Sequence, residues 1–289
     1  MSFEIVTDSC ANLPDEWIHR YGIHILSLIF RVEDEEFESY REDEVNDLTQ
    51  FYRLMREKKE ITTSLVNVEK TQVLLEKLLK EGKDVMYIGF SSGLSGSFQA
   101  VSMVVEELQQ QYPSQTILAI DSLSAALGEG LLVYYAAEHR NEGKSIIEVQ
   151  QWIFQHRLHL CHWFTVDDLF FLQRGGRVSQ TTAIVGSILC IKPVMHVDNE
   201  GKLIMVEKAR GRKKSLEALV HKMKETVSLE EHPIAFISHG DCKKDAEYVA
   251  MLVKEQLGIN NILIHTLDPV IGAHSGPGTV ALFFLGDHR

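Results

Sequence analysis

One segment constrains the fold of this chain more than any other, because it contains a complete succession of strand, loop, helix and strand. Residues 84–90 form an apolar strand, residues 91–97 a loop rich in glycine and serine, and residues 98–110 a helix. Residues 116–120 then form a second strand. A helix between two successive strands is typical of a parallel sheet, because parallel strands need a long crossover connection.

The same alternation extends on both sides of this unit. Further strands are predicted at residues 3–7 and 23–30, and further helices at residues 14–20, 68–79 and 125–137. The last of these is apolar almost all round, which is typical of a buried helix. The sequence therefore predicts an α/β protein whose N-terminal domain, residues 1–158, has a mainly parallel sheet with helices on both faces.

The remainder of the chain predicts a second domain, an α+β unit over residues 159–289. Its elements are strands near residues 193–197, 202–207, 234–238 and 262–267, and helices near residues 214–227 and 243–257. We expect His156, His159 and His162 to share one exposed helix end, where their spread is too wide to hold a single metal ion. His239 and His274 are expected in loops after strands.

Charge and composition exclude several classes of protein. The chain has 29 Lys and Arg against 41 Asp and Glu, a net charge of −12, so it lacks the basic footprint of a nucleic-acid binder. It has no apolar run of the ~20 residues that a membrane span needs, and its start lacks the pattern of a signal peptide. Its four cysteines follow no regular spacing. They are therefore read as reduced thiols, which favours a cytoplasmic location.

The loop Ser91–Ser97 is a candidate anion site. It lies between a strand and the start of a helix, where unpaired amides and the helix dipole favour negative charge. It has no lysine in the position that the phosphate-binding loop of a nucleotide site requires, so it favours a small oxyanion such as a carboxylate. An ordinary strand–helix turn with capping serines explains the loop equally well.

The same loop supports an alternative of another class. Residues 89–93 fit the G-x-S-x-G pattern of a nucleophile elbow, and Ser91, Asp268 and His274 follow in the chain order of an esterase triad. No H-G-G-G oxyanion segment precedes the loop. A serine esterase or thioesterase that uses Ser91 is therefore the competing hypothesis.

Two further features suggest binding rather than catalysis. Thr62, Thr63 and Ser64 cluster hydroxyl groups without an adjacent general base, which is more typical of neutral hydrogen bonding or of a turn. The run Lys208–Lys214 places cations at the start of a helix, where they oppose the dipole. Such a run suits docking of a phosphate or an acidic partner, although a solvated basic turn is an equally simple reading.

Taken in order, these segments resemble the DegV family of bacterial fatty-acid-binding proteins, of the FakB type. The matching segments are residues 6–9, 62–64, 91–97, 121–122, 167–169, 172–178, 192–193, 208–210 and 272–278. They extend over essentially the whole chain. Each motif is weak alone, and the specificity lies in their order and spacing.

The resemblance implies two α/β domains that hold one long-chain fatty acid, such as palmitate, stearate or oleate, in a tunnel between them. The implied carboxylate-binding residues are Thr62, Thr63, Ser92, Ser95, Arg177 and His274. The family implies a carrier without cofactor or metal rather than an enzyme.

Such a carrier presents the carboxyl group to an ATP-dependent fatty acid kinase and takes the acyl phosphate toward phospholipid synthesis, with at most a transient contact with the membrane surface. Arg210 and Arg212 match the segment expected to face the kinase or the phosphate. One departure concerns the headgroup: the family usually has Gln-Pro where this chain has Leu65 and Val66.

Overall fold

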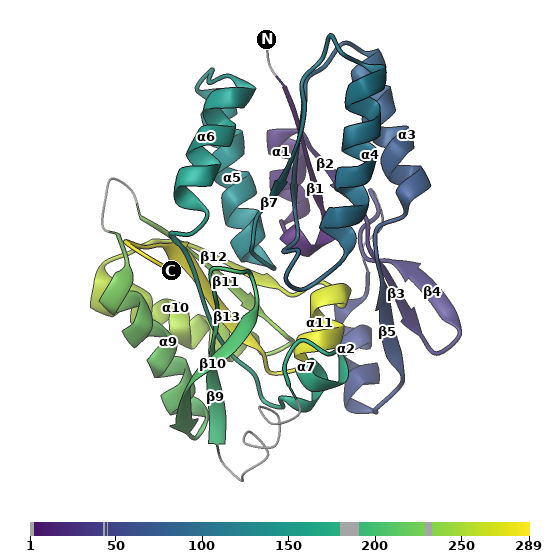
Figure 1. The fold of residues 1–289 in the computed structure, drawn as a ribbon. Coiled ribbons are helices and arrows are strands. Elements are labelled where there is room, and N and C mark those ends of the chain that lie inside the picture. Colours follow the sequence, from purple (N-terminus) through teal and green to yellow (C-terminus); the bar gives the residue numbers. More distant parts are fainter. Residues whose placement is uncertain (1–2, 43, 45, 180–190, 229–232) are drawn as a thin grey trace.

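The computed structural model describes residues 3–42, 44, 46–179, 191–228 and 233–289 of the chain. Figure 1 shows an upper α/β layer system, a larger sheet below it and a small sheet at one side. Within the described residues the strands form three sheets of four, six and three strands. Cys190 lies outside the described residues. No helix among those described is long and apolar enough to cross a membrane.

The first sheet is the parallel one that the sequence predicts. Its order is β2 (Ile23–Leu26), β1 (Glu4–Asp8), β6 (Val85–Gly89) and β7 (Ile117–Asp121), and every neighbouring pair is parallel. Since parallel strands end at the same edge, the loops after β1, β6 and β7 meet on one side of the sheet. That edge faces the six-stranded sheet (Figure 1).

Helices cover both faces of this sheet, also as predicted. Val6 and Tyr87 point toward α3 (Val68–Lys80) and α4 (Ser97–Gln111), with which they form one apolar cluster. Ile5 and Ile88 belong to a second cluster. The helices on that side are α1 (Asp15–Tyr21), α5 (Leu127–Asn141) and α6 (Ile146–His156). Successive strand residues alternate between the two faces, so each face has its own core.

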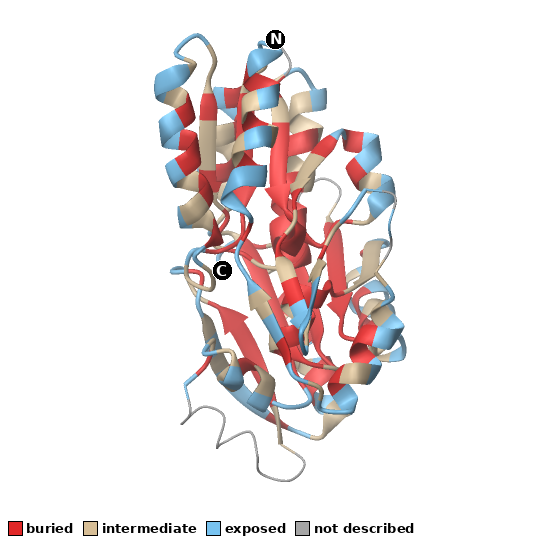
Figure 2. Cartoon of the chain, turned by 90° about the vertical axis from the view of Figure 1, so that its right-hand side faces the viewer, coloured by how far each residue is buried: buried red, intermediate tan, exposed pale blue. Residues whose placement is uncertain are grey.

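The six-stranded sheet is mixed. Its order is β10 (Leu203–Arg210), β9 (Ile191–Val197), β8 (Leu160–Thr165), β13 (Val280–Leu285), β11 (Ile234–His239) and β12 (Asn261–Thr266). Only β11 and β12 pair in parallel. One face packs against α9 (Arg212–Thr226) and α10 (Lys243–Leu257), and the other contacts α5. The inner strands β8, β13 and β11 are buried, whereas the edge strands β10 and β12 are largely not. Figure 2 shows buried strands at the centre of the molecule and helices with exposed outer faces. The predicted division between residues 158 and 159 stays a prediction.

The small antiparallel sheet positions two pieces of the site described below. It consists of β4 (Glu35–Glu38), β3 (Ile29–Val32) and β5 (Ile61–Ser64). Beside it lie α2 (Leu48–Arg56) and α11 (Pro269–Ser275), and α11 also contacts α7 (Phe170–Arg174). A short 3-10 helix, η1 (Ser9–Ala11), follows β1.

Several sequence-based expectations are wrong. The predicted strand 23–30 is two strands, β2 and β3, that belong to different sheets. His156 ends α6, whereas His162 is buried in β8, so the three histidines do not share an exposed helix end. The strands β8 and β13 were not predicted at all. Both are buried, and such short strands lack the alternation of polar and apolar residues that reveals a half-buried strand.

Candidate functional site

A cavity lies between the parallel sheet and the six-stranded sheet. It contains about 850 Å³ of space not filled by protein atoms, part of it open to solvent. Its wall is formed by β5, the glycine loop after β6, the start of α5, the strands β8 and β13, and α11. Most of the side chains are apolar: Leu28, Leu65, Phe90, Leu94, Ala125, Ala126, Phe164, Leu172, Val197, Leu203, Leu267, Val270, Ile271, Ala281 and Phe283.

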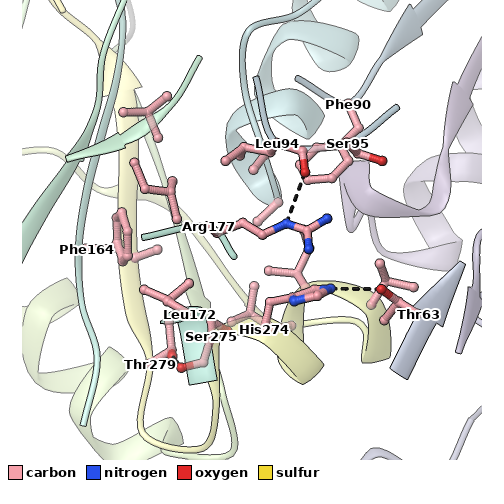
Figure 3. Close-up of a pocket in the computed structure, with 18 of the residues that line it drawn as sticks. Thr63, Phe90, Leu94, Ser95, Phe164, Leu172, Arg177, His274, Ser275 and Thr279 are labelled. Atoms are coloured by element: carbon pink, nitrogen blue, oxygen red, sulfur yellow. Dashed lines mark hydrogen bonds between the residues drawn. The ribbon is translucent and has the colours of Figure 1, made fainter. Parts of the chain in front are cut away.

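Polar side chains gather at one end of this cavity. Figure 3 shows Thr63, Ser95, Arg177 and His274 there, coming from four different segments. Thr63 Oγ1 lies 2.8 Å from His274 Nε2. Arg177 Nε donates to the carbonyl oxygen of Leu94 at 3.1 Å, and its Nη1 donates to the carbonyl of Gly175. The cavity therefore combines an apolar wall with a compact polar end.

The local sequence explains the position of His274. The Asp268 carboxylate caps α11 by accepting from the amides of Val270 and Ile271, and Pro269 occupies the first turn. His274 thus lies in the last turn of a helix, and the expectation of a loop at this position is wrong. Gly175 makes room for the ring, because a Cβ atom there would lie 2.2 Å from His274 Nδ1.

Burial and neighbouring cations keep the His274 ring neutral at pH 7. Burial lowers its pKa to about 4, and the positive charges of Arg177 and Arg174 contribute to the same shift. Burial also lowers the pKa of Arg177, although a guanidinium stays charged near neutral pH. Within the described part of the chain, the Arg177 guanidinium has no carboxylate partner and donates only to carbonyl oxygens. A half-buried cation of this kind is suited to pairing with an anion.

Ser95 has a structural contact as well as a place in the cavity wall. Its Oγ accepts from the amide of Ser97 at 3.2 Å and lies 3.0 Å from Ser97 Oγ. These contacts fix the entrance to α4. The glycine loop therefore both begins the helix and contributes a hydroxyl to the cavity wall, and its role as an anion site stays a prediction.

The structure brings together four of the six predicted carboxylate-binding residues. Thr62 and Ser92 are exposed and do not line the cavity. Thr62 precedes Thr63 in β5, and adjacent strand residues point to opposite sides. The amide of Ser92 donates to Asp121 Oδ1 at 3.2 Å. The apolar wall, in particular Phe164 and Phe283, was missed because apolar strand residues of a cavity wall have the same sequence pattern as a core.

A family model described as "Uncharacterised protein, DegV family" matches residues 2–287. A DegV domain-containing protein of Clostridium perfringens is 41% identical over 287 residues, which are 99% of this chain and 98% of that protein. This chain belongs to the DegV family.

Solved structures of DegV proteins share the whole fold. A DegV family protein from Thermus thermophilus, described by its fatty acid binding, has a TM-score of 0.88 and 26% identity, with 99% of this chain and 100% of that chain covered. DegV from Bacillus subtilis, described as a fatty acid binding protein, has a TM-score of 0.83 and 28% identity, with 99% and 100% covered. Fatty acid binding is thus an activity of DegV proteins.

The esterase hypothesis finds no support in the geometry of this DegV chain. Ser91 is fully buried, and its hydroxyl donates to the carbonyl of Gly201 at 2.9 Å. His274 Nε2 lies against Thr63 instead, and Asp268 is engaged with the amides of α11 and with Ser39. The three residues therefore do not form a nucleophile–base–acid chain.

The two arginines predicted to dock a partner, Arg210 and Arg212, differ in exposure and in ion pairing. Arg210 is exposed at the end of β10, in the segment that matches DegV proteins. Arg212 is mostly buried in ion pairs, with Asp245 at 2.8 Å and Asp167 at 3.7 Å. These ion pairs give Arg212 a structural role at the start of α9, which also explains a basic residue in that first turn.

A second set of buried ionisable residues lies outside the cavity wall. Asp8 accepts from the amides of Cys10 and Phe90 and from the hydroxyl of Tyr87, at 2.9–3.0 Å. Burial raises the pKa of Asp8, and burial together with Asp8 raises the pKa of Glu129 well above its usual range. Among the described residues no cluster of histidine, cysteine or acidic side chains is arranged to hold a metal ion.

Proposed function

We propose that this protein binds one long-chain fatty acid such as palmitate, stearate or oleate, with the carboxylate at the polar end of the cavity and the acyl chain along the apolar wall. One observation carries the proposal. Arg177 places a half-buried positive charge, without an acidic partner in the described structure, at the end of a cavity whose other walls are mostly apolar. A carboxylate with an apolar tail complements both features.

The polar end offers several donors to a carboxylate. Arg177 supplies charge-assisted hydrogen bonds, and the hydroxyls of Thr63 and Ser95 supply neutral ones. The neutral His274 ring orients Thr63 across their 2.8 Å contact. Burial of the tail adds about 0.8 kcal/mol per methylene, so a long chain contributes most of the affinity and the carboxylate fixes its direction. In this proposal Thr62 and Ser92 are not direct ligands, because both are exposed.

Relatives support the same function. DegV proteins from Thermus thermophilus, Streptococcus agalactiae and Bacillus subtilis, at 26–28% identity to this chain, are each described as binding fatty acids. Their structures align with this one along almost the full length of the chain.

We further propose that the chain is a carrier of the FakB type in the cytoplasm and performs no catalysis of its own. It would present the bound carboxyl group to an ATP-dependent fatty acid kinase and carry the acyl phosphate toward phospholipid synthesis, with transient contact with the membrane surface. The exposed Arg210 supports a docking role, because it lies in a basic segment of an acidic protein. Arg212 would act indirectly, by holding the start of α9 through its ion pairs.

The binding function is tested by native mass spectrometry of the purified protein, followed by extraction and identification of any lipid. We expect a one-to-one adduct that extracts as a long-chain fatty acid. A ligand-free mass, together with failure to take up added palmitate, would contradict the proposal. Hydrolysis of an activated ester that is abolished by Ser91→Ala would instead establish the esterase.

The carrier role needs a separate experiment, because binding alone does not test it. Arg210→Ala is expected to bind palmitate like the unchanged protein but to support slower phosphorylation of the acyl group by a fatty acid kinase. Lys254→Ala, an exposed lysine in the last turn of α10, is the control. Equal phosphorylation rates for the two variants would remove Arg210 from the docking surface.

A further inference from the structure

One ionisable side chain lies in the cavity wall far from the polar end. His162 on β8 pairs with Phe283 on β13, while Phe164, two residues along β8, pairs with Ala281. All four line the cavity. Thr279 immediately precedes β13, and its hydroxyl donates at 2.9 Å to the carbonyl oxygen of Ser275, the residue after His274. Phe283 is four residues further along the chain, so His162 lies roughly 13 Å from Thr279 at about 3.3 Å per residue.

The hydrogen bonds of His162 identify which ring nitrogen carries the proton. Arg289 Nη2 donates to Ser124 Oγ at 3.2 Å, and a guanidinium can only donate. Among the described residues, the other contact of this hydroxyl is His162 Nε2 at 3.0 Å. Ser124 is fully buried, and among the described residues in contact with its hydroxyl only His162 Nε2 can accept, so we assign the hydroxyl hydrogen to Nε2. The proton of the neutral ring is then on Nδ1.

This Nδ1–H group has no hydrogen-bond partner among the residues that the structure describes. The His162 side chain itself is part of the cavity wall. The side chain is buried, with an exposed fraction of 2%, and burial lowers its pKa well below the usual range. A neutral donor thus belongs to a part of the cavity wall that Val197 and Phe283 otherwise line with apolar atoms.

We propose that the far end of the cavity recognises a hydrogen-bond acceptor in the distal half of the acyl chain, so that the preferred ligands are long-chain fatty acids with a hydroxyl or keto oxygen there. This inference rests on the proposed function, since the carboxylate must lie at Arg177 for the distal half to reach His162. A saturated tail leaves the Nδ1–H group without an acceptor, whereas an oxygen at that depth supplies one. The π electrons of a double bond are a weaker acceptor.

The test uses delipidated protein titrated with stearate, oleate, 12-hydroxystearate and 2-hydroxystearate. We expect 12-hydroxystearate to bind about tenfold more tightly than stearate, equivalent to about 1.4 kcal/mol. 2-Hydroxystearate, whose hydroxyl lies beside the carboxylate, should not show this advantage. In His162→Phe the ratio between 12-hydroxystearate and stearate should fall to one or below. His265→Phe replaces a histidine outside the cavity wall and should keep the ratio of the unchanged protein.

The outcomes separate this inference from the proposed function. Failure to bind any of the four acids contradicts the proposed function itself. Binding of stearate as tight as that of 12-hydroxystearate overturns only the inference, and so does a preference for oleate over both, which would indicate selection by chain shape. The comparison of ligands on the unchanged protein decides the question even if His162→Phe does not fold.

Discussion

Arg177 and His274 at the polar end of the cavity differ from Asp8 and Asp268 nearby both in burial and in what surrounds them, because the two acids are buried whereas Arg177 and His274 are of intermediate exposure. The two acids receive hydrogen bonds from backbone amides at the starts of η1 and α11 and from the loop after β6. The guanidinium of Arg177 has no acid among the described residues and borders a cavity. The two carboxyl groups are thus shielded from water and held by amides, whereas the guanidinium is partly shielded and faces the cavity.

This difference in partners distinguishes residues that stabilise the fold, such as Asp8 and Asp268, from residues of the proposed binding site, such as Arg177. A buried acid that accepts from the amides of its own chain fixes a loop or a helix start. A half-buried cation that faces a cavity can pair with an anion that enters the cavity. The pattern of partners, rather than burial or charge alone, therefore identifies the ligand-binding end.

The largest predicted effect concerns Asp268, one of the two buried acids, and is a dependence of the protein's stability on pH. Burial raises the pKa of Asp268 to about 7, against about 3.9 in an unfolded chain. Between these values the folded protein holds a proton that the unfolded chain has lost, so stability falls as the pH rises from about 4 to 7 and is constant above. At 1.36 kcal/mol per pH unit, the cost is about 4 kcal/mol.

Asp268→Asn lacks this titration. The free energy of unfolding of the unchanged protein, minus that of the variant, should fall across the pH window, as measured by urea unfolding at several pH values. Asp34→Asn, in the exposed turn after β3, is the control and should show no such trend. A difference that rises with pH would mean that Asp268 is ionised and stabilising.

The next effect tests the binding side. Arg177→Met removes the cation and should weaken palmitate binding by about 3 kcal/mol, or more than 100-fold, because the carboxylate is left buried without its partner. Arg174→Met is the matched control. Arg174 lies on the adjacent helix α7 but is exposed and outside the cavity wall. Equal affinities of the two variants in calorimetric titrations would move the carboxylate elsewhere.

Ser95→Ala should have a smaller effect, because it removes a neutral donor. We expect a loss of about 1–3 kcal/mol in palmitate affinity, the cost of leaving a buried acceptor without one partner. Part of any loss of stability would come from the contact of Ser95 with the Ser97 amide, so unfolding is measured alongside binding. Ser92→Ala, in the same loop but exposed, should bind palmitate normally. A larger loss from Ser92→Ala would reverse their assignment.

The smallest effect is a change in the titration of His274. In the ligand-free protein its ring should titrate near its pKa of about 4, and a bound carboxylate should raise that pKa by favouring the charged form. The nuclear magnetic resonance signal of the ring proton on Cε1, recorded with and without palmitate, measures both values. A midpoint near 6.5 in the ligand-free protein would show that the ring is solvated.

The sequence predicts the parallel half of the fold better than the mixed half. The strand–helix alternation of residues 84–120 fixes its own topology, because each crossover connects neighbouring parallel strands. The strand β13 has the sequence Val-Ala-Leu-Phe-Phe-Leu, which is apolar throughout and lacks a period that distinguishes a strand from a buried helix. The strand β8 contains His162, whose buried partner Ser124 is 38 residues away. Such pairings are tertiary and leave no local signal.

The predictions for the site were limited in the same way, because contacts between distant segments leave no local sequence signal. The resemblance to DegV proteins implied Thr63, Ser95, Arg177 and His274, which all line the cavity, yet it could not separate Thr63 from Thr62 without the register of β5. The hydroxyl of Ser91 looked catalytic in the sequence motif. Its burial against Gly201 depends on the β9–β10 turn more than 100 residues away, a contact that no local motif encodes.

In the proposed function, the half-buried cation of Arg177 selects a carboxylate, while the apolar wall binds any acyl tail of suitable length. Competition between palmitate and hexadecanol for the delipidated protein tests it most directly, because the two ligands share the tail and differ in the headgroup. The account predicts that palmitate binds at least about 100-fold more tightly, a difference of roughly 3 kcal/mol, and that Arg177→Met abolishes most of it. Equal affinities in the unchanged protein would show that the tail alone determines binding, and would contradict the account.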